Sequence, residues 1–345
     1  MTYYSQENHG PYAMYDLGDF ALASGETLAG GQLAYATLGT LNAAKDNAIL
    51  ITTWWSGTSK IMETTYTGAG RAIDPAKYFV IIANQLGSGV STSPNNAPAS
   101  QAKSKFPRLD ISDDVRAQER LISEKFGVKQ LALAFGGSMG AQQCFEWAVR
   151  FPDRVKRIAA LAGTARCSDH SRLFGQTLRE AMSSDANFKH GDYKDSAEIA
   201  EGLKRVATLM SVSGWCPEFY RHEVWKGLGF ASVPEFKTNF MEGYFAPMDP
   251  NVLIAEVMKW QAHDVSRTHG GDLAKALGAI KAKTLIMQIE NDLMFPLADC
   301  EADHKMIPGS QLRVIKGHSG HLGLFAIEAN YSPQFDKYLG ELLAA

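Results

Sequence analysis

The stretch LALAFGGSMGAQQCFEWAV, residues 131–149, decides the interpretation of this 345-residue chain. A short apolar run leads into the glycine-rich centre, and an apolar-periodic segment follows without a gap. This order predicts a buried strand, a sharp turn and a helix, with Ser138 held out at the turn. Gly136 and Gly140 fit such a bend, because side chains on both sides of the serine would clash with the backbone. The backbone N–H of Met139, at the helix N-terminus, would point at an oxygen that the serine attacks.

The composition is that of an ordinary globular protein, with 45% hydrophobic residues, 21% charged residues and a net charge of −3. No long basic block occurs, so we expect neither nucleic acid nor a membrane surface as a partner. No apolar run reaches the length of a membrane span, and the N-terminus does not read as a signal peptide. The four cysteines lie far apart without metal-ligand spacing. We therefore expect buried thiols, a cytoplasmic location, no metal and no cofactor.

Apolar runs alternate with helical segments along most of the chain. This alternation predicts an α/β fold with a mostly parallel sheet covered by helices on both faces. Residues 14–40 alternate polar and apolar side chains with glycines between them, which is typical of antiparallel strands. We expect helices before Pro75 and over 110–126, and a closing helix over 335–343. The other expected strands are 47–53, 78–83, 155–162, 284–289 and 312–315.

Strand-like runs disappear between residues 166 and 275, where the pattern is helical and rich in aromatic side chains. We interpret this segment as a helical cap inserted into a core domain made of residues 1–165 and 276–345. The loop over 84–107 is rich in Gly, Ser, Pro and Asn, and its length indicates a functional or packed loop rather than a simple connection.

A nucleophilic serine needs a base within hydrogen-bond reach and an acid that orients the base. In this type of sheet the acid and then the histidine follow the serine along the chain, each in a loop after a strand. Asp292 comes directly after the expected strand over 284–289. Two histidines, His318 and His321, follow the next strand. The spacing favours His321, which precedes the apolar run LGLF, and we expect His318 at the surface or in a supporting position.

The loop after the strand over 47–53 is the expected source of a second oxyanion donor. The backbone N–H of Trp54 or Trp55 would join that of Met139 there. The two tryptophan rings and the aromatic side chains of the cap would wall a small apolar pocket. Core packing is an equally good interpretation of any one of these rings.

Several stretches together resemble the homoserine O-acetyltransferase family of α/β-hydrolase-fold proteins, over most of the chain. The resemblance implies Ser138 as nucleophile, Asp292 as acid, His321 as base, and Trp55 with Met139 as oxyanion donors. It also implies a mainly helical cap and a homodimer formed through that cap. The stretches that carry it are YFVIIANQLGSGVSTSP (78–94), FPRLDISDDVRAQERLI (106–122), FGGSMGAQQCFEWAVRFPDRV (135–155), DLMFP (292–296) and GHLGLF (320–325).

Two departures from the family pattern bear on the second substrate. In the transferases an aspartate follows the catalytic histidine and helps to hold the amino group of homoserine, whereas Leu322 stands here. If Arg205 is the family's substrate-binding arginine, the tyrosine expected seven positions later is Val212. A buried ammonium without its carboxylate partner costs about 2–5 kcal/mol. These residues make the acceptor pocket too apolar for homoserine, whereas water needs no acceptor pocket.

We therefore predict a serine hydrolase similar to the family's carboxylesterase branch, which cleaves small acyl esters, acetyl esters above all, through an acyl-enzyme on Ser138. The substrate-binding residues that we expect are Trp54, Arg205, Val212 and Leu322. One alternative is an acyl-CoA-dependent acetyltransferase acting on homoserine or another alcohol. The other is a ligand-binding protein that keeps the fold without turnover.

Overall fold

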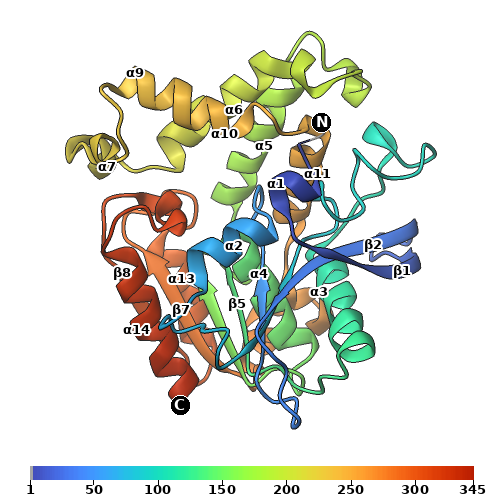
Figure 1. Cartoon of the computed structure of the whole chain (residues 1–345), viewed down its shortest axis with the longest axis vertical. Coiled ribbons are helices and arrows are strands. Elements are labelled where there is room, and N and C mark those ends of the chain that lie inside the picture. Colours follow the sequence, from blue (N-terminus) through green and yellow to red (C-terminus); the bar gives the residue numbers. More distant parts are fainter. Residues whose placement is uncertain (1–2) are drawn as a thin grey trace.

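An eight-stranded sheet runs through the centre of the molecule, and helices lie on its faces and beyond its strand ends (Figure 1). The computed structural model describes residues 3–345. The strand order is β1-β2-β4-β3-β5-β6-β7-β8, with antiparallel pairing of β1 with β2 and of β2 with β4, and parallel pairing from there on. This confirms the predicted fold class. The strands are β1 (Ala13–Ala21), β2 (Thr27–Leu38), β3 (Ala48–Thr52), β4 (Phe79–Ala83), β5 (Leu133–Gly137), β6 (Arg157–Leu161), β7 (Lys283–Ile289) and β8 (Gln311–Ile315).

The central strands are apolar on both sides because helices cover both faces of the sheet. In β3, Leu50 packs into one layer, whereas Ile49 and Ile51 pack into the other. The first layer contains α3, α4, α12 and α13, and the second contains α2 and α14. The bounds are α1 (Gln6–His9), α2 (Ser59–Tyr66), α3 (Ile111–Arg120), α4 (Met139–Arg150), α12 (Leu273–Gly278), α13 (Leu297–Met306) and α14 (Tyr331–Ala344).

Two expected core helices differ from the observed ones at their ends. The helix before Pro75 stops at Tyr66. The helix expected over 110–126 begins at a capping box formed by Asp110 and Asp113 and continues after α3 as the π-helical turn η2 (Leu121–Lys125). Hydrophobic periodicity locates a helix, but it does not reveal a local change of helix type.

Between β6 and β7 the chain leaves the sheet, and the elements that the structure describes there are all helical. We use the name cap for residues 166–275, and Figure 1 shows most of its helices above the strand ends. Helix α5 packs on α6 and α11. The cap boundaries stay a prediction. The cap elements are α5 (Asp169–Ser183), η3 (Lys189–Gly191), η4 (Ser196–Ile199), α6 (Ala200–Ser213), α7 (Pro217–Arg221), α8 (Val224–Gly227), α9 (Val233–Phe236), η5 (Lys237–Glu242), α10 (Gly243–Phe245), α11 (Pro250–Ala262) and η6 (Val265–His269).

Three features complete the fold. The loop over 84–107 is ordered around one 3-10 turn, η1 (Lys103–Lys105), and most of its first ten residues are buried. All four cysteines are free and buried, as predicted. No helix within residues 3–345 has the length and apolar character that crossing a membrane would require. The homodimer and the cytoplasmic location stay predictions, because the structure describes a single chain.

Candidate active site

Ser138 stands between β5 and α4 with φ 55° and ψ −121°, a positive φ that few residues other than glycine adopt. The surrounding turn is crowded. A β-carbon at Gly136 would lie 2.6 Å from the carbonyl oxygen of Gly140, and one at Gly140 would lie 2.8 Å from the carbonyl oxygen of Thr52. Both positions therefore need glycine, and the turn projects the serine hydroxyl from the start of a helix.

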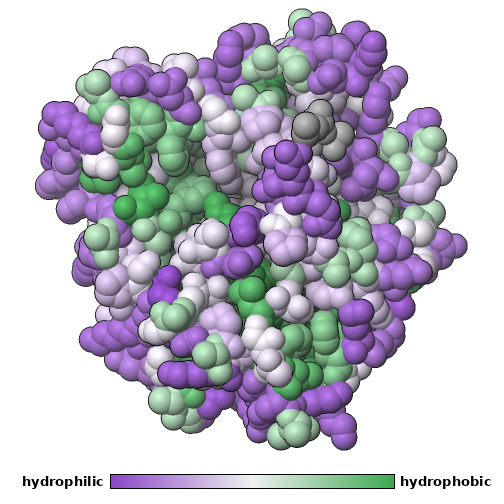
Figure 2. Space-filling model, in the orientation of Figure 1, coloured by the Kyte–Doolittle hydropathy of each residue, from purple (hydrophilic) through white to green (hydrophobic). Residues whose placement is uncertain are grey.

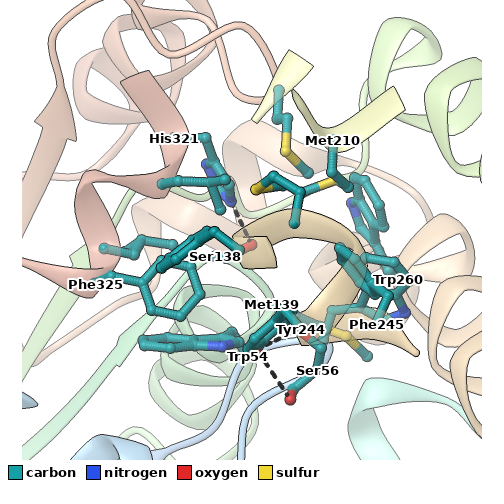
Figure 3. A pocket seen from close by; sticks show the side chains of 16 residues that line it. Trp54, Ser56, Ser138, Met139, Met210, Tyr244, Phe245, Trp260, His321 and Phe325 are labelled. Carbon is teal, nitrogen blue, oxygen red and sulfur yellow. Dashed lines mark hydrogen bonds between the residues drawn. The ribbon is translucent and has the colours of Figure 1, made fainter. Parts of the chain in front are cut away.

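The side chain of His321 connects Ser138 to Asp292. Its Nε2 lies 3.0 Å from Oγ of Ser138 (Figure 3), and its Nδ1 lies 2.8 Å from Oδ2 of Asp292. The other carboxylate oxygen, Oδ1, accepts the backbone N–H groups of Met294 and Phe295 at 2.8 and 2.9 Å. Since Nδ1 faces the carboxylate, Nε2 is left to accept the proton of the serine hydroxyl. These three side chains, buried together, can perform nucleophilic acyl chemistry.

The sheet explains why residues so far apart in the sequence meet. Asp292 follows β7, and His321 lies in the 3-10 helix η7 (Gly320–Phe325) after β8. Parallel strands β7 and β8 are neighbours, so the loops at their carboxyl ends lie side by side. His318 lies elsewhere: its half-buried ring stacks on His222 of the cap, with centroids 4.1 Å apart.

The two residues expected to supply oxyanion donors lie at the same cavity as Ser138. Trp55 and Met139 both line the cavity that contains the serine. Met139 is the first residue of α4, so its N–H has no acceptor within the helix. Within residues 3–345 neither amide donates a hydrogen bond. The indole Nε1 of Trp55 donates to the carbonyl oxygen of Leu253 at 3.0 Å, which ties this loop to the cap.

Ser138 and His321 open into a cavity between the core and the cap. It encloses about 600 Å³ of empty space including its mouth. On the face shown in Figure 2, hydrophobic surface gathers in the hollow between the cap and the core. The residues that line the cavity are Trp54, Trp55, Ser56, Ser138, Met139, Met210, Phe240, Met241, Tyr244, Phe245, Trp260, Met294, His321, Leu322, Leu324 and Phe325.

The cavity wall is apolar apart from a few hydroxyl groups and His321. No Asp, Glu, Lys or Arg of the described chain lines it. Tyr244 of the cap and Ser56 of the core bring their hydroxyl oxygens to 3.0 Å from each other at this wall (Figure 3). Burial raises the pKa of Tyr244, so its phenol stays protonated and available as a donor. The cavity therefore suits a small, uncharged molecule.

Arg205 and Val212 do not line this cavity. Val212 is 67% exposed, and the exposed Arg205 donates from Nη1 to Oγ of Ser184 at 3.1 Å. The apolar stripe of α6 turns the opposite face of the helix inward, so these two side chains face solvent. The structure therefore does not bring these two expected residues to the cavity beside Ser138. Trp54 and Leu322, the other two expected residues, do line the cavity.

Aromatic side chains of the cap line the cavity, as expected, but Met210 and Ser56 were absent from the sequence-based prediction. Met210 is the inward member of the α6 stripe, and the spacing of Leu203, Val206 and Met210 is a signal that would have found it. Tyr244 and Ser56 lie 188 positions apart, and no local pattern connects them. Only the placement of the cap on the core brings their hydroxyl groups together.

Comparison with known proteins finds that the relatives of this chain include ester hydrolases and acetyltransferases. The family model described as "alpha/beta hydrolase fold" matches residues 57–326. An ethyl acetate hydrolase of Pseudomonas veronii is 51% identical over 344 residues, covering 100% of this chain and 99% of the relative. The crystal structure of an acetylester hydrolase from Corynebacterium glutamicum superposes with a TM-score of 0.98 at 48% identity, covering 100% of both chains. A homoserine O-acetyltransferase of Nostoc punctiforme is 31% identical over 319 residues, covering 88% of each chain.

Proposed function

The chain belongs to the α/β-hydrolase fold family, in the branch that holds acetyl esterases and homoserine O-acetyltransferases, and from this membership we propose that it is a carboxylic ester hydrolase for small acyl esters, acetyl esters above all. The observation that carries the proposal is the hydrogen-bonded series of Ser138, His321 and Asp292 at an apolar cavity. The names of the relatives at 51% and 48% identity support the same chemistry.

In the first half of the reaction, Oγ of Ser138 attacks the ester carbonyl while its proton moves to Nε2 of His321. Asp292 holds the other ring nitrogen and stabilises the imidazolium that forms. The tetrahedral oxyanion accepts hydrogen bonds from the backbone N–H groups of Trp55 and Met139. The C–O bond to the alcohol then breaks, and the alcohol leaves with the proton from His321, which gives an acyl-enzyme on Ser138.

In the second half, water attacks the carbonyl carbon of the acyl-enzyme and gives a proton to His321. The second tetrahedral intermediate uses the same two amides. When it collapses, Oγ of Ser138 leaves and takes the proton back, and the carboxylic acid is released. Water supplies the hydroxyl group of the acid, so the serine is regenerated without any cofactor.

The character of the cavity supports water, rather than homoserine, as the acyl acceptor. Homoserine carries an ammonium and a carboxylate, and no charged side chain of the described residues lines the cavity to pair with either. Leu322 stands directly beside His321 and is 8% exposed within this wall. Burying an unpaired charge costs about 2–5 kcal/mol, which is roughly thirty- to several thousand-fold in affinity.

A direct comparison of the two activities tests this choice. We expect kcat/KM for the hydrolysis of ethyl acetate or p-nitrophenyl acetate to exceed that for acetyl transfer from acetyl-CoA to homoserine by about 100-fold or more. Both reactions are followed with the same enzyme preparation, by release of acetate and by release of free thiol. Efficient transfer to homoserine with negligible hydrolysis would refute the esterase proposal and favour the transferase.

The outward position of Arg205 and Val212 gives a second prediction. Replacing either residue by alanine should change kcat/KM for acetyl esters by less than about twofold, because surface substitutions have small effects. Met210→Ala on the same helix is the matched comparison, since Met210 lines the cavity, and it should change kcat/KM by several-fold more. Steady-state kinetics of the three variants measure this. A tenfold loss in Arg205→Ala would mean that this side chain does reach the substrate.

A further inference from the structure

Three charged side chains form a buried cluster where the cap meets the core. Nζ of Lys259 lies 2.7 Å from Oδ2 of Asp114 and 2.9 Å from Oε1 of Glu256, and all three side chains are 0% exposed. Nζ also donates to the carbonyl oxygen of Leu86 at 2.7 Å, and Oδ1 of Asp114 accepts the N–H of Leu86 at 2.7 Å. The proposed reaction uses none of these groups. We call Asp114, Glu256 and Lys259 the buried cluster.

The buried cluster joins one cap helix to two parts of the core. Glu256 and Lys259 lie on α11, Asp114 lies on α3, and Leu86 belongs to the loop after β4. Helix α11 also supplies part of the cavity wall, because Trp260 follows Lys259 directly and lines the cavity. The position of α11 therefore affects the shape of the cavity. It also affects a hydrogen bond between α11 and Trp55.

That contact involves the loop that carries one proposed oxyanion donor. The carbonyl oxygen of Leu253, one turn before Glu256 on α11, accepts the indole N–H of Trp55 at 3.0 Å. A shift of α11 therefore moves both Trp260 and the anchor of Trp55. Small displacements of groups that position a reaction reduce its rate strongly.

The charges of the buried cluster do not balance when all three groups are ionised. Two carboxylates and one ammonium leave one net negative charge in a region without solvent contact, and such a charge is costly. Nζ of Lys259 donates to Leu86 and lies within ion-pair distance of Asp114 and Glu256. Within residues 3–345, no hydrogen bond reaches Oδ2 of Asp114 or either carboxylate oxygen of Glu256. One proton on the carboxylates removes the excess charge. Glu256 is better able to hold it, because neither of its oxygens accepts a hydrogen bond, whereas Oδ1 of Asp114 accepts the N–H of Leu86.

The pKa values of the two carboxyl groups agree with one retained proton. Burial, opposed by Lys259, raises the pKa of Glu256 to about 8. Burial, again opposed by Lys259, raises the pKa of Asp114 to about 6. With these pKa values, Glu256 keeps its proton at neutral pH and loses it in mildly alkaline solution.

Other charged groups near α11 have partners outside the buried cluster. On α3, Asp113 is paired with Arg116 of its own helix. From α5, Arg172 and Arg179 bind Gln261, at the end of α11, at 2.9 and 3.2 Å. The charges that directly face Glu256 are therefore those of Lys259 and Asp114.

We propose that the buried cluster positions the wall of the substrate cavity, and that it does so only while its two carboxylates share a proton. Glu256 and Lys259 are positioning residues in this account, since they act through Trp55 and Trp260 rather than on the substrate. When Glu256 ionises, the uncompensated charge weakens the attachment of α11 to the core, and the cavity wall loses its catalytic geometry. The kinetic part of this inference rests on the proposed ester hydrolysis, whereas the part about stability does not.

Glu256→Gln tests the proposal, because glutamine resembles the protonated acid and stays neutral at every pH. A folded pKa of about 8 lies above the ordinary value of 4.5. Between these values the unfolded chain releases the proton and the folded chain keeps it, so the free energy of unfolding falls as pH rises and levels off above about pH 8. The variant lacks this loss. We expect its Tm to match that of the wild type near pH 5 and to exceed it by about 4 °C or more at pH 8.5.

The catalytic rate should depend on the same protonation of Glu256. We expect kcat of the wild type for an acetyl ester to fall about threefold or more between pH 7 and pH 9.5, and that of Glu256→Gln to change by less than about 1.5-fold. Glu146→Gln is the matched control. Glu146 is also a buried carboxylate with a raised pKa, but Arg150 of the same helix binds it at 2.6 Å, and it is not part of the buried cluster. This control should keep the pH profile of the wild type.

The two readouts separate the possible results. If Tm and kcat of Glu256→Gln both run parallel to the wild type across pH 5–9.5, the shared proton is refuted. If only the Tm profile differs, the cluster is structural and the positioning role is refuted. If the wild type hydrolyses no ester at any pH, the proposed function fails, and the Tm profiles still support or refute the shared proton. Lys259→Met should unfold or lose much stability, since it leaves two carboxylates without a cation.

Discussion

Ser138→Ala is expected to lower kcat for the hydrolysis of acetyl esters by a factor on the order of 10⁴–10⁶. The variant keeps the cavity and both backbone amides but has no oxygen with which to form the acyl-enzyme. The fold should remain, because alanine accepts the same backbone and removes a single hydroxyl group. Initial rates with p-nitrophenyl acetate and ethyl acetate measure the loss, and thermal unfolding measures the integrity of the fold.

A second serine provides the control for Ser138→Ala. Ser112, near the start of α3, has the same 6% exposure as Ser138 and does not line the cavity. Ser112→Ala should therefore leave kcat within about twofold of the wild type, as is usual away from a reacting centre. If Ser138→Ala kept more than a tenth of the wild-type rate, the serine would not be the nucleophile. A folded protein with this fold and no turnover in the wild type would favour the binding-protein alternative.

His321→Ala should cause a loss of similar size, on the order of 10⁴–10⁶ in kcat, because the serine then has no base and the leaving alcohol has no acid. Its imidazole lies 3.0 Å from Ser138 and 2.8 Å from Asp292. No other described hydrogen bond reaches Oγ of Ser138, so no second group is in place to take over the proton. Rates across pH 6–9 with the same esters measure the effect.

His318→Ala is the natural comparison, since the two histidines lie three positions apart. The ring of His318 stacks on His222, and His318 does not line the cavity that contains Ser138. We expect its removal to change kcat by less than about twofold and to affect mainly the packing between the cap and the loop after β8. If His318→Ala were inactive and His321→Ala nearly normal, the assignment of the base would be wrong.

The sequence pattern predicted the layers of the fold well, because buried strands and amphipathic helices follow local rules. The alternation over residues 14–40 corresponds to the antiparallel pair β1 and β2, and the apolar run over 47–53 contains β3. The strand order is not a local property. Insertion of β4 between β2 and β3 depends on contacts across the whole sheet, and no single segment indicates it.

The order of chemistry-bearing residues along the chain indicated which residues would meet at the site. Asp292 and His321 each follow a strand, and parallel neighbouring strands bring their loops together. The same reasoning does not extend to the cap, because a helix can present any side to the core. The family pattern places Arg205 and Val212 among the expected substrate-binding residues, but the rotation of α6 turns both outward.

The cavity wall also contains residues that sequence reasoning could not assemble. Tyr244 and Ser56 come from the cap and the core, as do Lys259 and Asp114 in the buried cluster. From the sequence alone, Lys259 would be expected at the surface, because lysine is almost never fully buried unless it is paired. Pairs between the cap and the core become visible only when the two segments are placed together.

Trapping the acyl-enzyme tests the central claim most directly. The wild type is mixed with excess p-nitrophenyl acetate, quenched in acid within the first turnover, digested and analysed by mass spectrometry. We predict one added acetyl group on the peptide that contains Ser138, formed as fast as p-nitrophenol is released and lost at the rate of acetate production. Turnover without any acetyl group on Ser138, or with the acetyl group on another residue, would contradict the account.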